Sequence, residues 1–220
     1  MGEKRRVGIL GGTFDPIHEA HLQMGREARE AFSLDQVWFM PTGVSYFKSG
    51  ERRISSPGDR AAMVRLAIEG EPGFIFSDIE IRRGGATYTA ETLQELCRRY
   101  PDTEFYFILG ADSIRDIARW HLPEVIFACA VIIAANRDDQ VPEEELTREI
   151  KRLEERYGAR ICPMSFQSPV SSSEIRSGLA SGEPVAENAV PPAVLAYIQE
   201  HRLYREPEKG AAPYDDGGNM

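Results

Sequence analysis

Two histidines three residues apart follow a glycine-rich stretch near the start of the chain. Residues 11–21 read GGTFDPIHEAH, with histidine at positions 18 and 21. Residues three apart in a helix lie on the same face, so a helix that begins here would place His18 and His21 side by side. Imidazole donates hydrogen bonds to phosphate oxygens, and as imidazolium it offsets negative charge that develops on a bridging oxygen. The pair therefore favours a site that holds phosphate groups.

The glycines before the histidines support the same interpretation. Gly11 and Gly12 come after a short apolar run, Val7–Leu10, which predicts a buried strand. Glycine lets the backbone approach a ligand closely, and ligands of open parallel sheets bind beyond the carboxyl ends of the strands. Two familiar phosphate loops are excluded. No Gly-Lys pair is followed by Ser or Thr, and the glycines do not form GxGxxG.

Two other interpretations of the histidine pair stay open on the residues alone. The side chains could point into solvent from the start of a helix, or they could be half of a metal site. A zinc site is the weaker alternative, because no third ligand is nearby and the HExxH spacing is absent.

A second polar cluster lies far along the chain, at residues 168–176, which read SPVSSSEIR. In the structural interpretation, Ser171 and Glu174 have the spacing of a capping box at the start of a helix. In the functional interpretation, free N–H groups and hydroxyls at this helix start bind phosphate, with Arg176 one turn later.

The middle of the chain offers polar groups at the end of another predicted strand. Gly110 would allow close approach of a nucleotide, and Asp112 either accepts a hydrogen bond from a ribose hydroxyl or caps a helix. Trp120 follows and is either a core aromatic residue or a ligand contact.

These motifs together resemble a known family. GGTFDPIHEAHL resembles the signature of the HxGH-type nucleotidyltransferases, especially the bacterial nicotinate-nucleotide adenylyltransferases, with Ala20 in place of the usual glycine. VSSSEIR resembles the family motif ISSTxIR, and the segments RxGxTYTxxTL at residues 83–93 and GADS…W from residue 110 resemble its substrate-binding segments. The likeness extends to about Arg205.

The resemblance implies adenylyl transfer from ATP to nicotinate mononucleotide, which gives deamido-NAD and pyrophosphate. It implies catalytic roles for His18, His21, Lys48 and Arg176. The implied ATP-binding residues are Gly11, Gly12, Thr13, Phe14, His18, His21, Gly110, Asp112, Ser172, Ser173 and Arg176. The implied mononucleotide-binding residues are Thr87, Tyr88, Thr89, Trp120 and His121. Trp120 would stack on the pyridine ring, and backbone groups near Thr89 and His121 would receive the carboxylate.

The expected mechanism needs no general base, because a phosphate monoester is already a nucleophile at neutral pH. The protein must hold two polyanions and neutralise charge on the leaving group. The glycine loop, His18, His21, Lys48 and Arg176 are expected to supply positive potential, and Arg176 with the serines is expected to clamp pyrophosphate. Mg²⁺ is expected to arrive on ATP rather than in a protein metal site.

Three alternatives remain. The first is a preference for nicotinamide mononucleotide, from which the acid differs by one carboxylate. The second is a pantetheine-phosphate or glycerol-phosphate nucleotidyltransferase, which would lack the TYTxxTL and GADS…W segments. The third is a non-catalytic nucleotide-binding module on the same fold.

Short apolar runs alternate with helical patterns along the chain, which predicts an α/β protein with a doubly wound, mostly parallel sheet of the Rossmann-like nucleotidyltransferase type. Strands are expected at Val7–Leu10, Val37–Met40, Phe74–Ser77, Phe105–Leu109, Ala130–Ala135 and Ala159–Cys162. Helices are expected at Glu19–Phe32, Pro57–Glu69, Thr89–Tyr100, Glu143–Tyr157, Ser173–Ala180 and Pro192–His201. Residues 1–205 are expected to form one domain, followed by a disordered tail at 206–220.

Composition sets the remaining expectations. The 220 residues carry a net charge of −9 and are 42% hydrophobic, which favours a folded core and argues against nucleic acid or anionic membrane as a partner. The longest apolar run, Val125–Ala135, is shorter than the roughly 20 residues that a membrane span needs. Three cysteines without CxxC spacing fit a reducing cytoplasm. The sequence sets no oligomeric state.

Overall fold

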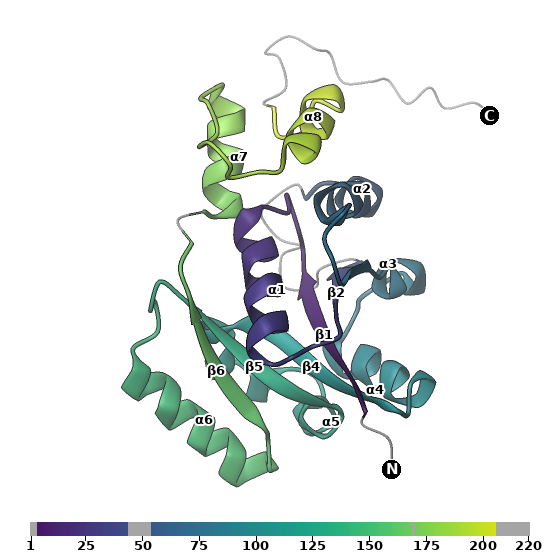
Figure 1. The fold of residues 1–220 in the computed structure, drawn as a ribbon, viewed down its shortest axis with the longest axis vertical. Helices are drawn as coiled ribbons and strands as arrows, with labels where there is room; N and C mark the ends of the chain where they lie inside the picture. Colours follow the sequence, from purple (N-terminus) through teal and green to yellow (C-terminus); the bar gives the residue numbers. More distant parts are fainter. Residues whose placement is uncertain (1–3, 44–53, 169, 206–220) are drawn as a thin grey trace, which may run out of the picture.

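The computed structural model describes residues 4–43, 54–168 and 170–205. Within them, six strands form one sheet in the order β3-β2-β1-β4-β5-β6, and every neighbouring pair is parallel (Figure 1). The strands are β1 Arg5–Gly12, β2 Gln36–Pro41, β3 Phe74–Phe76, β4 Thr103–Gly110, β5 Ala130–Arg137 and β6 Ile161–Phe166. The strand order reverses between β1 and β4, and in such sheets a ligand binds at that point. The predicted doubly wound parallel sheet is confirmed.

Helices cover both faces of the sheet. One face packs against α1 Glu19–Ala31 and α2 Pro57–Ile68. The helices α7 Ser172–Ser181 and α8 Pro192–Glu200 lie beyond the ends of the strands and extend the same core, with α8 packed on α2 (Figure 1). The other face packs against α3 Ile79–Arg83, α4 Thr89–Arg99, α5 Pro123–Cys129, α6 Glu143–Tyr157 and the short 3₁₀ helices η2 Ala111–Arg115 and η3 Ile117–Arg119.

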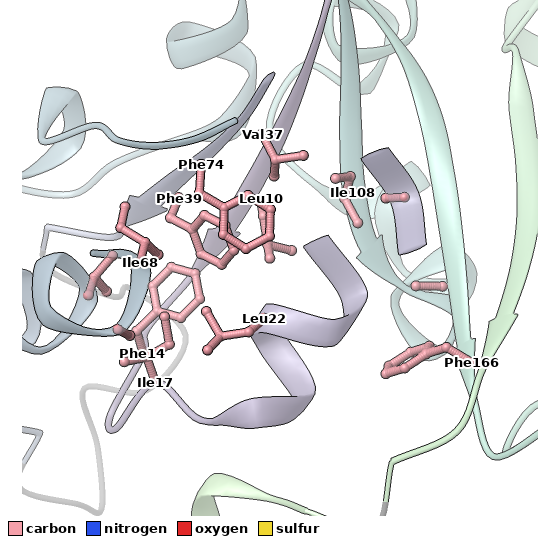
Figure 2. Close-up of a cluster of buried hydrophobic side chains, with 14 of the residues drawn as sticks. Leu10, Phe14, Ile17, Leu22, Val37, Phe39, Ile68, Phe74, Ile108 and Phe166 are labelled. Carbon is pink, nitrogen blue, oxygen red and sulfur yellow. The ribbon is translucent and has the colours of Figure 1, made fainter. Parts of the chain in front are cut away.

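The two hydrophobic cores follow from the alternation of side chains along the strands. In β1, Leu10 faces the α1 side, whereas Val7 and Ile9 face the α4 side. Figure 2 shows the first core, where Leu10 lies with Phe39 of β2 among the side chains beside α1.

The local signals for α2 are confirmed. Ser56 is the N-cap, its Oγ accepts a hydrogen bond from the N–H of Asp59 at 3.1 Å, and Pro57 is the first helical residue. These are the residues that the geometry of a helix start prefers.

Three expectations about elements are corrected. β1 runs through Gly12, because Gly11 and Gly12 pair with the end of β2 and belong to the ladder. The last strand is Ile161–Phe166 rather than Ala159–Cys162, since an edge strand tolerates Pro163. The helix α3 was not predicted, because one turn is too short for a helical period to show.

No helix in the described ranges is long and apolar enough to cross a membrane. The predicted single domain over residues 1–205 stays a prediction. The predicted disordered tail, 206–220, lies outside the described residues.

Candidate active site

Two cavities lie at the carboxyl edge of the sheet, where β1 and β4 end. The larger, about 680 Å³, is lined by five threonines together with apolar side chains; we call it the threonine cavity. The smaller, about 490 Å³, is lined by His18, His21, Arg137 and the serines at the start of α7; we call it the histidine cavity. Asp112 lines both cavities.

The histidine pair has the predicted arrangement. His18 is the N-cap of α1, and its ring centroid lies 3.9 Å from that of His21. The backbone N–H of His18 donates to Nδ1 of His21 at 3.2 Å. A nitrogen that accepts a hydrogen bond carries no proton, so the neutral His21 ring carries its proton on Nε2.

His18 does not carry the expected charge. It is 4% exposed, and its burial, together with the positive charges of Arg137 and Arg176, lowers its pKa to about 4. At neutral pH His18 is therefore neutral, which corrects the expectation that this imidazole supplies positive potential.

Arg137 supplies a positive charge that the sequence-based reasoning missed. It ends β5, lines the histidine cavity and donates from Nη1 to the carbonyl of Val170 at 2.9 Å. The neighbouring Asn136 is buried and exchanges two hydrogen bonds with the backbone of Val141. The sequence signal for this charge is the polar pair Asn136-Arg137, which directly follows the apolar run of residues 130–135. Strand ends of parallel sheets line ligand sites.

The serine cluster caps a helix as predicted, and its binding of phosphate stays a prediction. Ser171 is the N-cap of α7, and its Oγ accepts from the N–H of Glu174 at 3.3 Å. Ser172 and Ser173 line the histidine cavity. Phosphate could therefore meet the N-terminal end of a helix at this point.

Arg176 is placed differently from the expectation. Its Nη1 donates to the carbonyl of Asp15 at 2.7 Å and its Nη2 to Oγ of Ser173 at 3.0 Å. Ser172 and Ser173 of α7 line the histidine cavity, whereas Arg176 does not. Arg176 thus joins α7 to the loop after β1, while its charge still lowers the pKa of His18.

The glycine loop lines the threonine cavity rather than the histidine cavity. Gly11, Gly12 and Thr13 all face that space. A Cβ on Gly11 would meet only the ring of Phe107, at 3.6 Å, whereas a Cβ on Gly12 would come within 3.2 Å of the ring of Phe14. Gly11 therefore leaves room in the cavity, and Gly12 leaves room for an aromatic side chain.

Phe14 was expected to contact ATP, but its side chain lies in the hydrophobic core. Its ring is 2% exposed and packs against Phe39 in the core (Figure 2). It also makes a T-shaped contact with the ring of His21, with centroids 5.0 Å apart. The Phe14 ring therefore supports the His21 ring from the side of the hydrophobic core.

The threonine cavity contains three of the five predicted mononucleotide-binding residues. Thr87, Thr89 and Trp120 line it, and Trp120 packs edge-to-face against Phe107 with ring centroids 6.4 Å apart. Tyr88 and His121 instead contact each other with their rings tilted by 41° and their centroids 4.5 Å apart, and they are not among the lining residues.

Glu80 is a second residue that the sequence did not reveal. It lines the threonine cavity, is 8% exposed, and accepts a hydrogen bond from Oγ1 of Thr92 at 2.9 Å. Burial raises the pKa of its carboxyl. Thr92 also accepts from Nη1 of Arg83 at 2.9 Å, so this wall of the cavity is fixed by a hydrogen-bond network.

Asp112 lies where the two cavities meet, and Gly110 lines the histidine cavity beside it. A Cβ on Gly110 would be 2.4 Å from Oδ1 of Asp112, so a larger residue there would displace this carboxylate. Asp112 Oδ1 accepts from the N–H of Ser113 at 2.9 Å and makes no cap for η2. Lys48, the remaining predicted residue, lies outside the described residues.

Comparison with known proteins agrees with this geometry. A family model described as cytidylyltransferase-like matches residues 9–178. A probable nicotinate-nucleotide adenylyltransferase of Dehalococcoides mccartyi is 43% identical over 202 residues, which cover 90% of this chain and 97% of that protein. One of Lachnoclostridium phytofermentans is 40% identical and covers 91% of this chain and 99% of that protein.

The chain belongs to the cytidylyltransferase-like nucleotidyltransferases, among the nicotinate-nucleotide adenylyltransferases.

Solved structures agree with the fold. The nicotinic acid mononucleotide adenylyltransferase of Plasmodium falciparum, complexed with NaAD, superposes with a TM-score of 0.72 at 21% identity, covering 91% of this chain and 97% of that one. As a member of this family, the chain is a nucleotidyltransferase, and its two adjoining cavities match an enzyme that holds two substrates.

Proposed function

We propose that this nucleotidyltransferase transfers the adenylyl group of ATP to nicotinate mononucleotide, releasing deamido-NAD and pyrophosphate. The observation that carries the proposal is the junction of the two cavities at Asp112, which lines both, with the histidine pair on the wall of one of them. A reaction that joins two nucleotides needs two adjoining sites whose phosphates meet.

The mononucleotide base fits the threonine cavity. Trp120 offers an aromatic face for the pyridine ring, and Thr89 is the first residue of α4. The N-terminal end of a helix is partially positive, so the nicotinate carboxylate is held there by the backbone at the start of α4.

The triphosphate fits the histidine cavity. His21 donates from Nε2, the serines donate from the start of α7, and Arg137 supplies the positive charge. The phosphate of the mononucleotide attacks the α-phosphorus of ATP in line, the bond to the β-phosphate bridging oxygen breaks, and pyrophosphate leaves with the electron pair. Fixed donors at the leaving oxygens stabilise the transition state, and no side chain has to remove a proton.

Mg²⁺ is proposed to enter with ATP. Within the described part of the chain, no group of three His, Cys, Asp or Glu side chains could hold a metal ion. An ion that is bound mainly by phosphates and water needs no such group. The acidic net charge and the three cysteines without CxxC spacing support a cytoplasmic location for the enzyme.

The test is pyrophosphate release from ATP with either nicotinate mononucleotide or nicotinamide mononucleotide. The expected result is faster turnover of the acid than of the amide. Equal use of the two would contradict the carboxylate site at Thr89, and no release with either would contradict adenylyl transfer. Pantetheine phosphate serves as the control acceptor and is expected to give no release.

A further inference from the structure

The loop between β1 and α1 is held in place by distant parts of the chain. Arg60 Nη1 donates to the carbonyl of Thr13 at 2.9 Å, and the N–H of Glu19 donates to the carbonyl of Ala189 at 3.0 Å. Ser172 Oγ donates to the carbonyl of Pro16 at 3.2 Å. Since His18 and His21 follow this loop directly, its position sets where both imidazoles lie.

One side chain of the loop is itself an anchor point. Asp15 is 3% exposed, and its Oδ1 accepts a hydrogen bond from the hydroxyl of Tyr204 at 2.6 Å. The N–H of Ser55 also donates to this oxygen, at 3.4 Å. Tyr204 follows α8 and lies 189 residues further along the chain than Asp15.

The backbone around Tyr204 indicates that its position is enforced. Tyr204 has a φ of 63° and Arg202 a φ of 52°. A left-handed backbone is unfavourable for residues with large side chains, and it persists where the surroundings determine it. The tyrosine side chain packs against the hydrophobic core on the α1 side of the sheet, which leaves its hydroxyl on Asp15.

We propose that Tyr204 is a positioning residue of the adenylyl-transfer site: its hydrogen bond to Asp15 fixes the loop that presents His18 and His21 to the histidine cavity. The catalytic consequence rests on the proposed function. The mechanical part, that the tether keeps His18 buried, does not.

The chain contains a matched control. Tyr197 of α8 donates from its hydroxyl to Oδ1 of Asp59 in α2 at 3.0 Å. This is the same pair of residue types, also linking the C-terminal part of the chain to its N-terminal half, but Asp59 does not belong to the loop. Tyr204→Phe and Tyr197→Phe each remove one hydroxyl and one bond to a carboxylate.

The first measurement is steady-state kinetics of the full chain with ATP and nicotinate mononucleotide. Tyr204→Phe is expected to lower kcat by about 10-fold or more, because small displacements of catalytic groups have effects of this size, with KM for the mononucleotide changed little. Tyr197→Phe is expected to keep the wild-type kcat. Equal kcat values for the two variants would overturn the proposal.

The second measurement is NMR titration of His18 without substrate. In the wild type, burial and the charges of Arg137 and Arg176 lower its pKa to about 4, with the His21 ring beside it. In Tyr204→Phe the loosened loop is expected to admit water and raise this pKa toward 6.5, whereas Tyr197→Phe leaves it at about 4. A His18 pKa of about 4 in Tyr204→Phe would also overturn the proposal.

A double variant separates positioning from stability. Tyr204→Phe takes one hydrogen-bond donor away from the buried Asp15 side chain, and loss of a donor costs most where the buried acceptor is charged. Asp15→Asn removes that charge, so Asp15→Asn with Tyr204→Phe is expected to melt closer to the wild type than Tyr204→Phe alone, while kcat stays low. Recovery of kcat together with stability would show a purely structural role and overturn the proposal. A wild type that releases no pyrophosphate would contradict the proposed function, while the His18 titration would still test the tether.

Discussion

The two cavities differ in the side chains that they offer to an anion. The threonine cavity is walled by hydroxyls, aromatic rings and the buried Glu80, and the cation at its edge, Arg119, has a side chain that is 84% exposed. The histidine cavity contains Arg137, the neutral imidazole of His18, the ring of His21 and the start of α7. In the proposed function, the first cavity therefore recognises a flat ring by shape and dipoles, and the second concentrates positive charge for phosphates.

The difference shows where a protein with a net charge of −9 places its positive potential. Burying an imidazole beside two arginines keeps it neutral, so the charge is carried by guanidinium groups that do not lose their protons. The histidines then act as oriented hydrogen-bond donors. Four measurements test this difference between the cavities, and they are given in order of decreasing expected effect.

The neutrality of His18 has the largest expected effect, and it appears in stability. The folded-state pKa of about 4 lies below the unfolded value of 6.5, so the unfolded chain takes up the proton first as the pH falls. Stability from this group is complete above pH 6.5 and decreases down to about pH 4, by about 3 kcal/mol in total. Urea denaturation at pH 7 and pH 4 should show this extra loss in the wild type relative to His18→Gln. Equal losses in the two proteins would mean that His18 is not buried as a neutral group.

Removal of the second imidazole tests its role as a donor. His21→Ala should lower kcat on the order of 10²-fold, the scale for one preorganised donor at a developing charge. The midpoint of thermal unfolding should change little, because His21 is only partly buried. His201→Ala, at an exposed histidine at the end of α8, is the control and should retain wild-type turnover. Near wild-type turnover of His21→Ala would remove the donor role.

The aromatic wall of the threonine cavity should act on one substrate alone. Trp120→Ala should raise KM for nicotinate mononucleotide by about 10-fold, since stacking of a base on an aromatic ring contributes about 1–3 kcal/mol. KM for ATP should stay within about twofold. An increase for both substrates would mean that the cavities are not separate sites.

The exposed arginine at the same cavity should matter least. Arg119 pairs with Asp116 at 3.2 Å on the surface, and exposed ion pairs contribute about 0–1 kcal/mol. Arg119→Ala should therefore change KM for the mononucleotide by less than about threefold. A larger increase would show that this cavity also uses charge, and the contrast with the histidine cavity would weaken.

Much of the fold could be predicted from the sequence because its signals are local. The β4 and β5 strands are continuous apolar runs, and the Ser56-Pro57 start of α2 is determined by backbone geometry at one turn. The boundaries of β1 and β6 could not be predicted in the same way. Gly12 and Pro163 look like the ends of strands until a neighbouring strand, or the lack of one on an edge, decides whether they fit.

The candidate site likewise has features that could be predicted from the sequence and features that could not. The sequence alone determined which chemical groups were available and which pairs stand together at short range, as with His18 and His21, because helix geometry fixes residues three apart. Long-range packing, in contrast, places Gly11 on the threonine cavity, brings Arg137 to the histidines, and sets the hydroxyl of Tyr204 on Asp15. The charge of His18 depends on its burial, and its burial depends on chain segments that are distant in sequence. A local sequence pattern does not indicate which of these segments come into contact.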